Sequence, residues 1–333
     1  MNERYSRQIR YHDFGKEGQN RLQKLHVMIM GAGALGSHSA EMLARMGVGQ
    51  LTIIDMDIVD ESNLHRQATY DESDAARMVP KVEALKTHLS LINSEVTITD
   101  VNQELTPSNI EAVLTEAQPD IVIDGMDHFE IRYLINEACH KLHIPWIYGA
   151  AVGSKGTVFG IDYTGPCLKC MLQTIPTTGE SCAINGVLPP VVSQVTSMQV
   201  SELIRWVAGE GFSQKIMTFD CFNLKFNTFN AENLKDPQCP TCIRHNYELL
   251  HTQQKQSIEA LCGDAFLFRF GTQIFEHVDY LPLNVTKSNH FVKLAHYGDY
   301  TMTIFKDGRT HVYGIKNQTQ AKTVYNQLLK AIK

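Results

Sequence analysis

Apolar runs alternate with amphipathic segments along the first 150 residues of the chain. The apolar runs predict β-strands, and the segments between them carry apolar residues at helical spacing. The predicted strands cover residues 26–31, 50–55, 95–100, 120–125 and 145–150. The predicted helices cover residues 34–47, 81–93, 110–117 and 128–142. This alternation predicts a doubly wound α/β fold, in which helices cover both faces of a mostly parallel sheet.

The pattern changes after residue 153. Residues 155–163 predict an antiparallel strand that extends the sheet, and residues 191–209 predict a long helix after an irregular passage. We therefore expect a first domain over residues 1–250.

A second pattern begins near residue 257. Short β-rich runs follow one another, a Lys-Asp-Gly turn at residues 306–308 predicts a hairpin, and residues 320–332 predict a closing helix. We expect a small C-terminal α+β appendage over residues 255–333.

Composition narrows the functional classes. The chain has 30 basic and 36 acidic residues, for a net charge of −6, so it offers no broad attraction to nucleic acid or anionic membranes. The amino terminus is polar, and no window reaches the roughly 18 apolar residues that a membrane span needs. We expect a cytoplasmic protein that binds neither nucleic acid nor membrane.

A glycine-rich turn, GAGALG, lies between the first predicted strand and helix. Gly31, Gly33 and Gly36 would let the backbone approach a phosphate, whose charge the helix amino terminus stabilises. Asp55 ends the next strand, at about the offset where an acid binds ribose in Rossmann-like folds. Asp57 could instead bind the ribose or be a solvated loop acid. The alternative for the glycine turn is that it only lets the helix pack closely and binds no ligand.

A polar cluster after that strand distinguishes a nucleoside triphosphate from a dinucleotide. Triphosphate chemistry has to neutralise three phosphates and a leaving pyrophosphate, whereas hydride transfer needs little positive charge there. Arg66 and Lys81 supply cations, and Asn63 and Gln67 supply uncharged donors. Each alone could be an ordinary surface residue, but together with the glycine turn they favour ATP.

Acidic residues follow the fourth predicted strand. Asp124 ends it and Asp127 lies in the turn beyond, where a strand's carboxyl end would hold Mg²⁺ over the phosphates. Asp127 could instead cap the following helix. Arg132 could contact phosphate or substrate, although an ion pair within the fold is the favoured role.

Two C-x-x-C pairs indicate a metal site rather than disulfides in a reducing compartment. Cys167 and Cys170 pair naturally with Cys239 and Cys242. Four thiolates at this spacing predict a closed, structural Zn²⁺ site that clips the intervening segment to the sheet, with free thiols or redox pairs as the alternative. Three further cysteines fit a role as small buried apolar residues: Cys139, Cys221 and Cys262.

Eight motifs occur in the order found in one protein family. The motifs are YSRQI, GAGALG, LTIIDMDIVDESNLHRQ, PKVEA, DGMDHFEIR, GPCLKC, SCAINGVLPPVV and CPTC. On these motifs the chain resembles the MoeB/ThiF family of sulfur-carrier-protein adenylyltransferases, a branch of the ubiquitin-activating-enzyme superfamily, over about residues 2–246.

The resemblance implies an activity and partners. Members bind Mg-ATP and the Gly-Gly tail of a small ubiquitin-like carrier and form a carboxyl-adenylate. By motif, Asp55 would bind ribose, Asp127 would bind magnesium, and the phosphates would be bound by Asn63, Arg66 and Lys81. Arg7 of YSRQI would reach into the site of a partner subunit, which implies a homodimer. His128 departs from the family, which usually has Asn after the magnesium-binding Asp.

Sulfur delivery and the identity of the carrier stay open. Cys182 matches a family cysteine that takes part in sulfur transfer in thiamine-type members and is dispensable in molybdopterin-type members. The appendage lacks the active-site loop of a rhodanese, so a separate sulfur donor protein is expected. We slightly favour the molybdopterin carrier (MoaD type) over the thiamine carrier (ThiS type). An NAD-dependent dehydrogenase and a non-catalytic nucleotide-binding scaffold are the rival classes.

Overall fold

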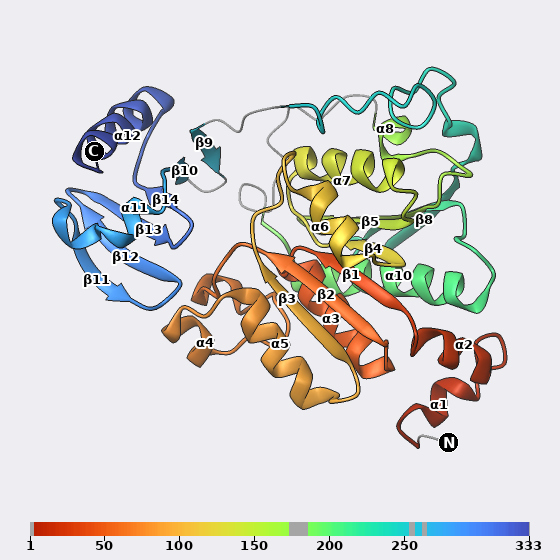
Figure 1. Ribbon diagram of the computed structural model, residues 1–333. Helices are drawn as coiled ribbons and strands as arrows, with labels where there is room; N and C mark the ends of the chain where they lie inside the picture. Colours follow the sequence, from red (N-terminus) through yellow and green to blue (C-terminus); the bar gives the residue numbers. More distant parts are fainter. Residues whose placement is uncertain (1–2, 173–185, 253–256, 262–264, 333) are drawn as a thin grey trace. The chain divides into compact units, whose positions relative to one another are not determined.

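The computed structural model describes residues 3–172, 186–252, 257–261 and 265–332. The chain divides into two compact units, residues 1–253 and 254–333 (Figure 1).

An eight-stranded sheet in the order β3-β2-β1-β4-β5-β6-β7-β8 forms the centre of the first unit. Neighbouring strands from β3 to β5 run parallel, and those from β5 to β8 run antiparallel. The predicted mixed sheet is therefore confirmed. Its strands are β1 (His26–Met30), β2 (Gln50–Asp55), β3 (Thr97–Asn102), β4 (Ile121–Asp124), β5 (Trp146–Val152), β6 (Lys155–Ile161), β7 (Lys215–Asp220) and β8 (Lys225–Asn230).

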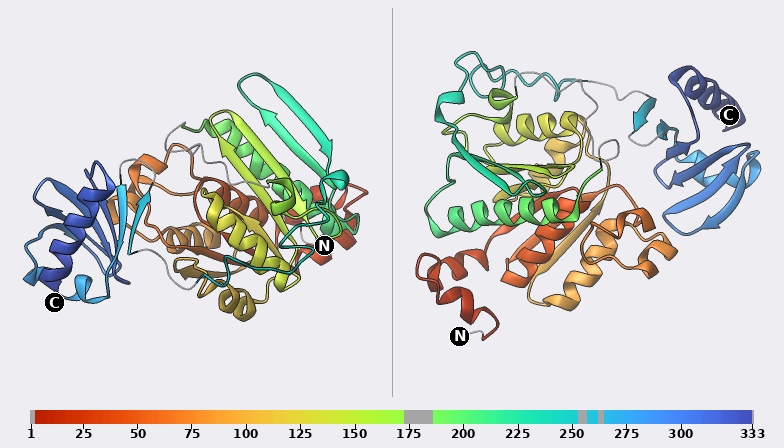
Figure 2. Two further views of the ribbon diagram at one scale, coloured as in Figure 1. Left: turned by 90° about the horizontal axis from the view of Figure 1, so that it is seen from above. Right: turned by 180° about the vertical axis from the view of Figure 1, so that it is seen from behind.

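Helices cover both faces of this sheet. One apolar cluster joins the sheet to α2 (Gly15–Leu22), α3 (Ala34–Met46), α5 (Lys81–Ile92) and α10 (Pro189–Ala208). A second cluster joins the opposite face to α6 (Ile110–Ala117), α7 (Phe129–Lys141) and α8 (Leu168–Met171). Figure 2 shows α3 and α10 in front when the unit is seen from behind. Two short helices, α1 (Ser6–Ile9) and α4 (Glu72–Arg77), also belong to the described part of this unit.

The β7–β8 hairpin was not predicted. Every residue of β8 is exposed, so the strand has neither an alternating nor a continuous apolar pattern. The predicted helix over 191–209 is confirmed and begins two residues earlier, because prolines fit the first turn of a helix.

The second unit is a six-stranded sheet in the order β11-β12-β13-β14-β10-β9, with all described pairings antiparallel. Its own apolar core joins the sheet to α12. The predicted α+β appendage is therefore confirmed. Its elements are β9 (Ile258–Leu261), β10 (Ala265–Arg269), α11 (Gln273–Glu276), β11 (Asn284–Ser288), β12 (Val292–Tyr297), β13 (Tyr300–Phe305), β14 (Arg309–Tyr313) and α12 (Gln318–Ile332).

Within the part of the chain that the structure describes, none of the helices combines the length and the apolar character needed to span a bilayer.

Candidate nucleotide and metal sites

The glycine-rich turn connects β1 to α3 at the carboxyl edge of the sheet. Gly31 has φ of +96°, which favours glycine. A Cβ on Gly36 would lie 1.7 Å from the Gly31 carbonyl oxygen, so the turn packs too tightly for a side chain there. A Cβ on Gly33 would meet nothing within 4 Å. Gly33 caps α3 without a side-chain hydrogen bond, so the turn leaves open space beside the helix amino terminus, where an anion fits.

The Asp55 carboxylate organises this turn. It accepts hydrogen bonds from the backbone N–H groups of Ala32 and Asp57, both at 2.7 Å. Burial raises the pKa of Asp55, and the nearby Lys81 ammonium opposes that rise. Both acids that were candidates for the ribose therefore lie beside the turn, in different settings: Asp55 bonds to backbone, whereas Asp57 forms an ion pair with Lys81 at 3.2 Å.

Lys81 is a buried cation at the start of α5, with a side chain that is 8% exposed. Burial lowers the pKa of Lys81, but the carboxylates of Asp57 and Asp55 outweigh that effect and hold the pKa above its ordinary value. Asp127 raises the pKa further. An ammonium held in its charged form beside the glycine turn is suited to an anionic ligand.

The polar cluster forms one hydrogen-bonded group. The Asn63 side-chain oxygen accepts from Arg66 Nη2 at 3.0 Å and from Gln67 Nε2 at 2.9 Å. Arg66 Nη1 also donates to the Ser62 carbonyl at 2.9 Å. The three predicted phosphate-binding residues of this segment thus lie together, and Gln67 is buried among them.

Three hydrogen bonds tie this segment to the glycine turn and α3. Ser37 Oγ accepts from the Ala68 N–H at 3.0 Å, and the Tyr70 hydroxyl donates to the Ala32 carbonyl at 2.8 Å. A His38 ring nitrogen lies 3.2 Å from the Arg66 carbonyl oxygen. Sequence reasoning missed these contacts, because each joins a side chain to a backbone group about 30 residues away and such a pairing leaves no motif in the sequence.

Two acidic residues lie at the end of β4 and just beyond it, in different environments. Asp124 is fully buried and pairs with Arg132 Nε at 3.0 Å, which confirms the ion-pair interpretation of Arg132. Burial raises the pKa of Asp124, and the Arg132 charge opposes that rise. Asp127 has a side chain that is 68% exposed. The helix-cap alternative for Asp127 is wrong, because His128 is the residue at the N-cap of α7.

Two predicted site residues lie apart from this group. Arg7 is exposed on α1, whose Gln8 donates to the Met46 carbonyl at the carboxyl end of α3. A 13-residue helix is about 20 Å long, and the glycine turn is at its other end. Cys182 lies outside the described residues, as does Cys262, whereas Cys139 is fully buried and Cys221 is half-buried.

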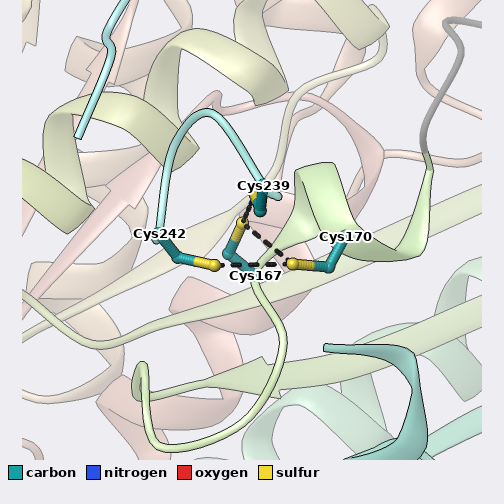
Figure 3. Close-up of side chains that lie close together, drawn as sticks. All are labelled: Cys167, Cys170, Cys239 and Cys242. Carbon is teal, nitrogen blue, oxygen red and sulfur yellow. Dashed lines mark hydrogen bonds between the residues drawn. The ribbon is translucent and has the colours of Figure 1, made fainter. Parts of the chain in front are cut away.

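The four cysteines of the C-x-x-C pairs come together from distant parts of the chain (Figure 3). Their sulfur atoms all lie within 4.8 Å of one another. The separations are 3.9 Å for Cys167–Cys170, 3.6 Å for Cys167–Cys239 and 3.4 Å for Cys170–Cys242. A tetrahedral Zn²⁺ with bonds of about 2.3 Å needs sulfur atoms about 3.8 Å apart. The cluster could therefore bind a metal of this kind.

Asn136 on α7 contacts both a cysteine of the cluster and the backbone beside it. Its amide donates to Cys167 Sγ at 3.7 Å, and its carbonyl oxygen accepts from the Leu168 N–H at 3.0 Å. Contacts of this kind orient metal ligands.

The fold and the two sites define a nucleotide-binding α/β protein with a separate four-cysteine cluster that could hold a metal. Comparison with known proteins gives the family. The model of the ThiF family matches residues 5–241, and the chain belongs to this family.

Relatives of known name agree with this assignment. The chain is 34% identical to the sulfur carrier protein ThiS adenylyltransferase of Bacillus subtilis, across 98% of this chain and 99% of that protein. It is 35% identical to the molybdopterin-synthase adenylyltransferase of Escherichia coli, across 72% of this chain and 95% of that protein. The crystal structure of E. coli MccB with ATP has a similar fold, with a TM-score of 0.62 and 22% identity, covering 73% of this chain and 75% of that one.

Proposed function

We propose that this protein adenylates the C-terminal glycine carboxylate of a small ubiquitin-like sulfur-carrier protein, using Mg-ATP and releasing pyrophosphate. The observation that carries the proposal is the buried, charged Lys81 beside the glycine turn of a ThiF-family chain. A dinucleotide site for hydride transfer has no need of such a cation.

Different residues around the turn bind different parts of the nucleotide. The turn of Gly31, Gly33 and Gly36 lets the phosphates approach the amino terminus of α3. The ribose is bound by Asp55, the last residue of β2, or by Asp57, which follows the strand. The phosphates are bound by Asn63, Arg66, Gln67 and Lys81. The exposed Asp127 carboxylate is an oxygen ligand of the kind that Mg²⁺ prefers, and the ion would neutralise phosphate charge.

The reaction itself needs charge neutralisation more than acid–base chemistry. A carrier carboxylate oxygen attacks the α-phosphorus of ATP, a new P–O bond forms, and the bond to the β,γ-pyrophosphate breaks with its electron pair leaving on pyrophosphate. The attacking group is already an anion at neutral pH, so no side chain has to remove a proton. Arg66 and Lys81 lower the repulsion between the two anions and stabilise the charge on the leaving group.

A homodimer completes the site in this proposal. Arg7 lies at the far end of α3 from the glycine turn of its own chain, so it can serve a catalytic site only in a second copy. Mixing an Arg7→Ala chain with an Arg66→Ala chain tests this directly: if each site draws Arg7 from the other chain, the mixture recovers activity that neither variant has alone.

The β7–β8 hairpin offers a docking surface for the carrier. Four large apolar side chains on it are strongly exposed: Phe222, Leu224, Phe226 and Phe229, at 77%, 90%, 57% and 55%. Exposed apolar patches of this kind are typical of protein interaction sites.

Two carriers are candidates. The molybdopterin carrier is supported by the 35% identity to the E. coli enzyme over most of the first unit. The thiamine carrier is supported by the B. subtilis relative, because that match also extends across the second unit. In the thiamine case Cys182 would take part in sulfur transfer.

The remaining parts have supporting roles. We propose that Cys167, Cys170, Cys239 and Cys242 hold a structural Zn²⁺, since four thiolates leave no open position for a substrate. A separate protein in the same cytoplasmic compartment would donate the sulfur.

Carrier-dependent exchange of labelled pyrophosphate into ATP tests the proposal. The wild-type protein is assayed with purified molybdopterin and thiamine carriers, and we expect exchange with one of them that Arg66→Ala or Asp127→Ala abolishes. Cys182→Ala should keep this exchange. Tight ATP binding without exchange would indicate a scaffold, and reduction of NAD by a substrate would indicate a dehydrogenase.

A further inference from the structure

A buried amide and a buried guanidinium meet where β4 ends beside the first half of β5. Gln199 of α10 is fully buried, and its Nε2 donates to the Asp124 carbonyl at 2.8 Å and to the Ile147 carbonyl at 3.2 Å. Arg132 of α7 reaches the same point from the opposite face of the sheet. Its Nη2 donates to the carbonyls of Met126 at 2.5 Å and Gly149 at 2.9 Å.

These side chains replace backbone pairing that ends there. The register of β4 and β5 covers only Val122 with Trp146 and Ile123 with Ile147. The Gln199 amide bonds to the Asp124 carbonyl, one residue past the last pair, and to the Ile147 carbonyl of that pair. Gly149 makes room for it, since a Cβ there would lie 2.3 Å from the Gln199 amide nitrogen. Gln199 therefore fixes the two strands relative to each other at the point where they separate.

Stability alone does not explain a glutamine at this position. Among the described residues its Oε1 is buried without a hydrogen-bond partner, which costs stability. Val195 and Leu203, one turn away on either side of α10, are buried and apolar. An apolar residue at 199 would continue that face, so the amide serves something other than packing.

We propose that Gln199 is a positioning residue for the Asp127 carboxylate, with Arg132 as its counterpart on the other face; this rests on the proposed magnesium role of Asp127. Gln199 holds the Asp124 carbonyl, three residues before Asp127, and Arg132 holds the carbonyl of Met126, the residue directly before it. Asp127 itself is largely exposed, and among the described residues its ion-pair partner is His128, at 3.6 Å, while Lys81 and Arg132 act on it as more distant charges. Its position therefore depends on the backbone that Gln199 and Arg132 fix.

The test compares ATP binding with and without Mg²⁺ by calorimetry in Gln199→Leu and Gln199→Met. We expect both variants to fold, to bind metal-free ATP like wild type, and to lose about tenfold of the Mg²⁺-dependent tightening, the lower end of what outer-shell partners contribute. Asp127→Asn is the reference for complete loss. Thr196→Val is the matched control, because Thr196 is equally buried on α10 but its hydroxyl bonds only to carbonyls of its own helix.

Three results of this comparison would overturn the proposal. Wild-type tightening by Mg²⁺ in both Gln199 variants would overturn the proposal, and so would an equal loss in Thr196→Val. Unfolding of both Gln199 variants would also overturn it, since the amide would then serve stability. If wild type binds Mg-ATP but exchanges no pyrophosphate with either carrier, the proposed function fails while this test still stands. Arg132→Lys is a weaker test, because it leaves the buried Asp124 carboxylate poorly compensated.

Discussion

Two alanine substitutions in the glycine-rich turn should have opposite effects on ATP binding and on stability. A methyl group on Gly33 would extend into open space beside the amino terminus of α3, where φ is −73° and no atom lies within 4 Å. Gly33→Ala should therefore fold normally but hinder the approach of a phosphate to the backbone. Loss of one charge-assisted hydrogen bond costs about 2 kcal/mol, or roughly 30-fold in the Kd for ATP.

Gly36→Ala is the matched control. Its methyl group would lie 1.7 Å from the Gly31 carbonyl oxygen and 3.1 Å from the Ile29 side chain. Overpacking of this kind costs about 1–3 kcal/mol, which corresponds to a fall of about 2–12 °C in Tm. Calorimetric titration with ATP and thermal unfolding measure both effects. An unchanged Kd in Gly33→Ala, with its Tm preserved, would refute the assignment of this turn to the phosphates.

Four further predictions concern other parts of the first unit. Lys81→Met should reduce pyrophosphate exchange by about 100-fold or more, because it removes a charge that stabilises the transition state; exchange within tenfold of wild type would exclude that role. Chelation of the metal should release Zn²⁺ from the four-cysteine cluster and lower the Tm of the first unit, as measured by a chromogenic zinc assay and calorimetry; a metal-free chain with unchanged Tm would contradict a structural role. Burial, with the nearby His245 and His143, lowers the pKa of His140 to about 4, so the folded chain binds fewer protons than the unfolded chain, whose histidine has an ordinary pKa of 6.5. The free energy of unfolding should thus fall as the pH decreases from 6.5 to 4, and the fall should be smaller in His140→Gln when both are measured in excess zinc. Phe226→Asp should raise the KM for the carrier about tenfold without affecting ATP binding; an unchanged KM would argue against docking on the hairpin.

Much of the first unit could be predicted from sequence, because its parallel strands are buried on both faces. β1 has four fully buried residues in succession and β4 is buried throughout, so each appears as a continuous apolar run. β8 carries Lys225, Asn227 and Asn230 and is exposed on both faces. Such an edge strand owes its place to backbone pairing with β7 rather than to an apolar pattern, and no periodicity reveals it.

The candidate site likewise contains residues that could be predicted from sequence and contacts that could not. Residues within contiguous motifs, such as Asn63 and Arg66, could be proposed because the spacing itself suggests the chemistry. The contacts of Gln199 and Tyr70 join distant segments and depend on the folded sheet. The sequence offered one usable signal for the first of them, a lone glutamine on the apolar face of a long helix. Arg132 was expected to form an ion pair, but its partner Asp124 and its burial became evident only in the structure.

The central claim is that this chain transfers AMP to a carrier carboxylate, and the intact mass of the carrier tests it most directly. Each carrier is incubated with the protein, Mg-ATP and pyrophosphatase, quenched in acid and examined by mass spectrometry. We predict that one carrier gains the mass of an adenylyl group, that the gain is lost when its terminal glycine is deleted, and that Arg66→Ala abolishes it. An unmodified mass for both carriers, with active wild-type protein that binds Mg-ATP, would contradict the account.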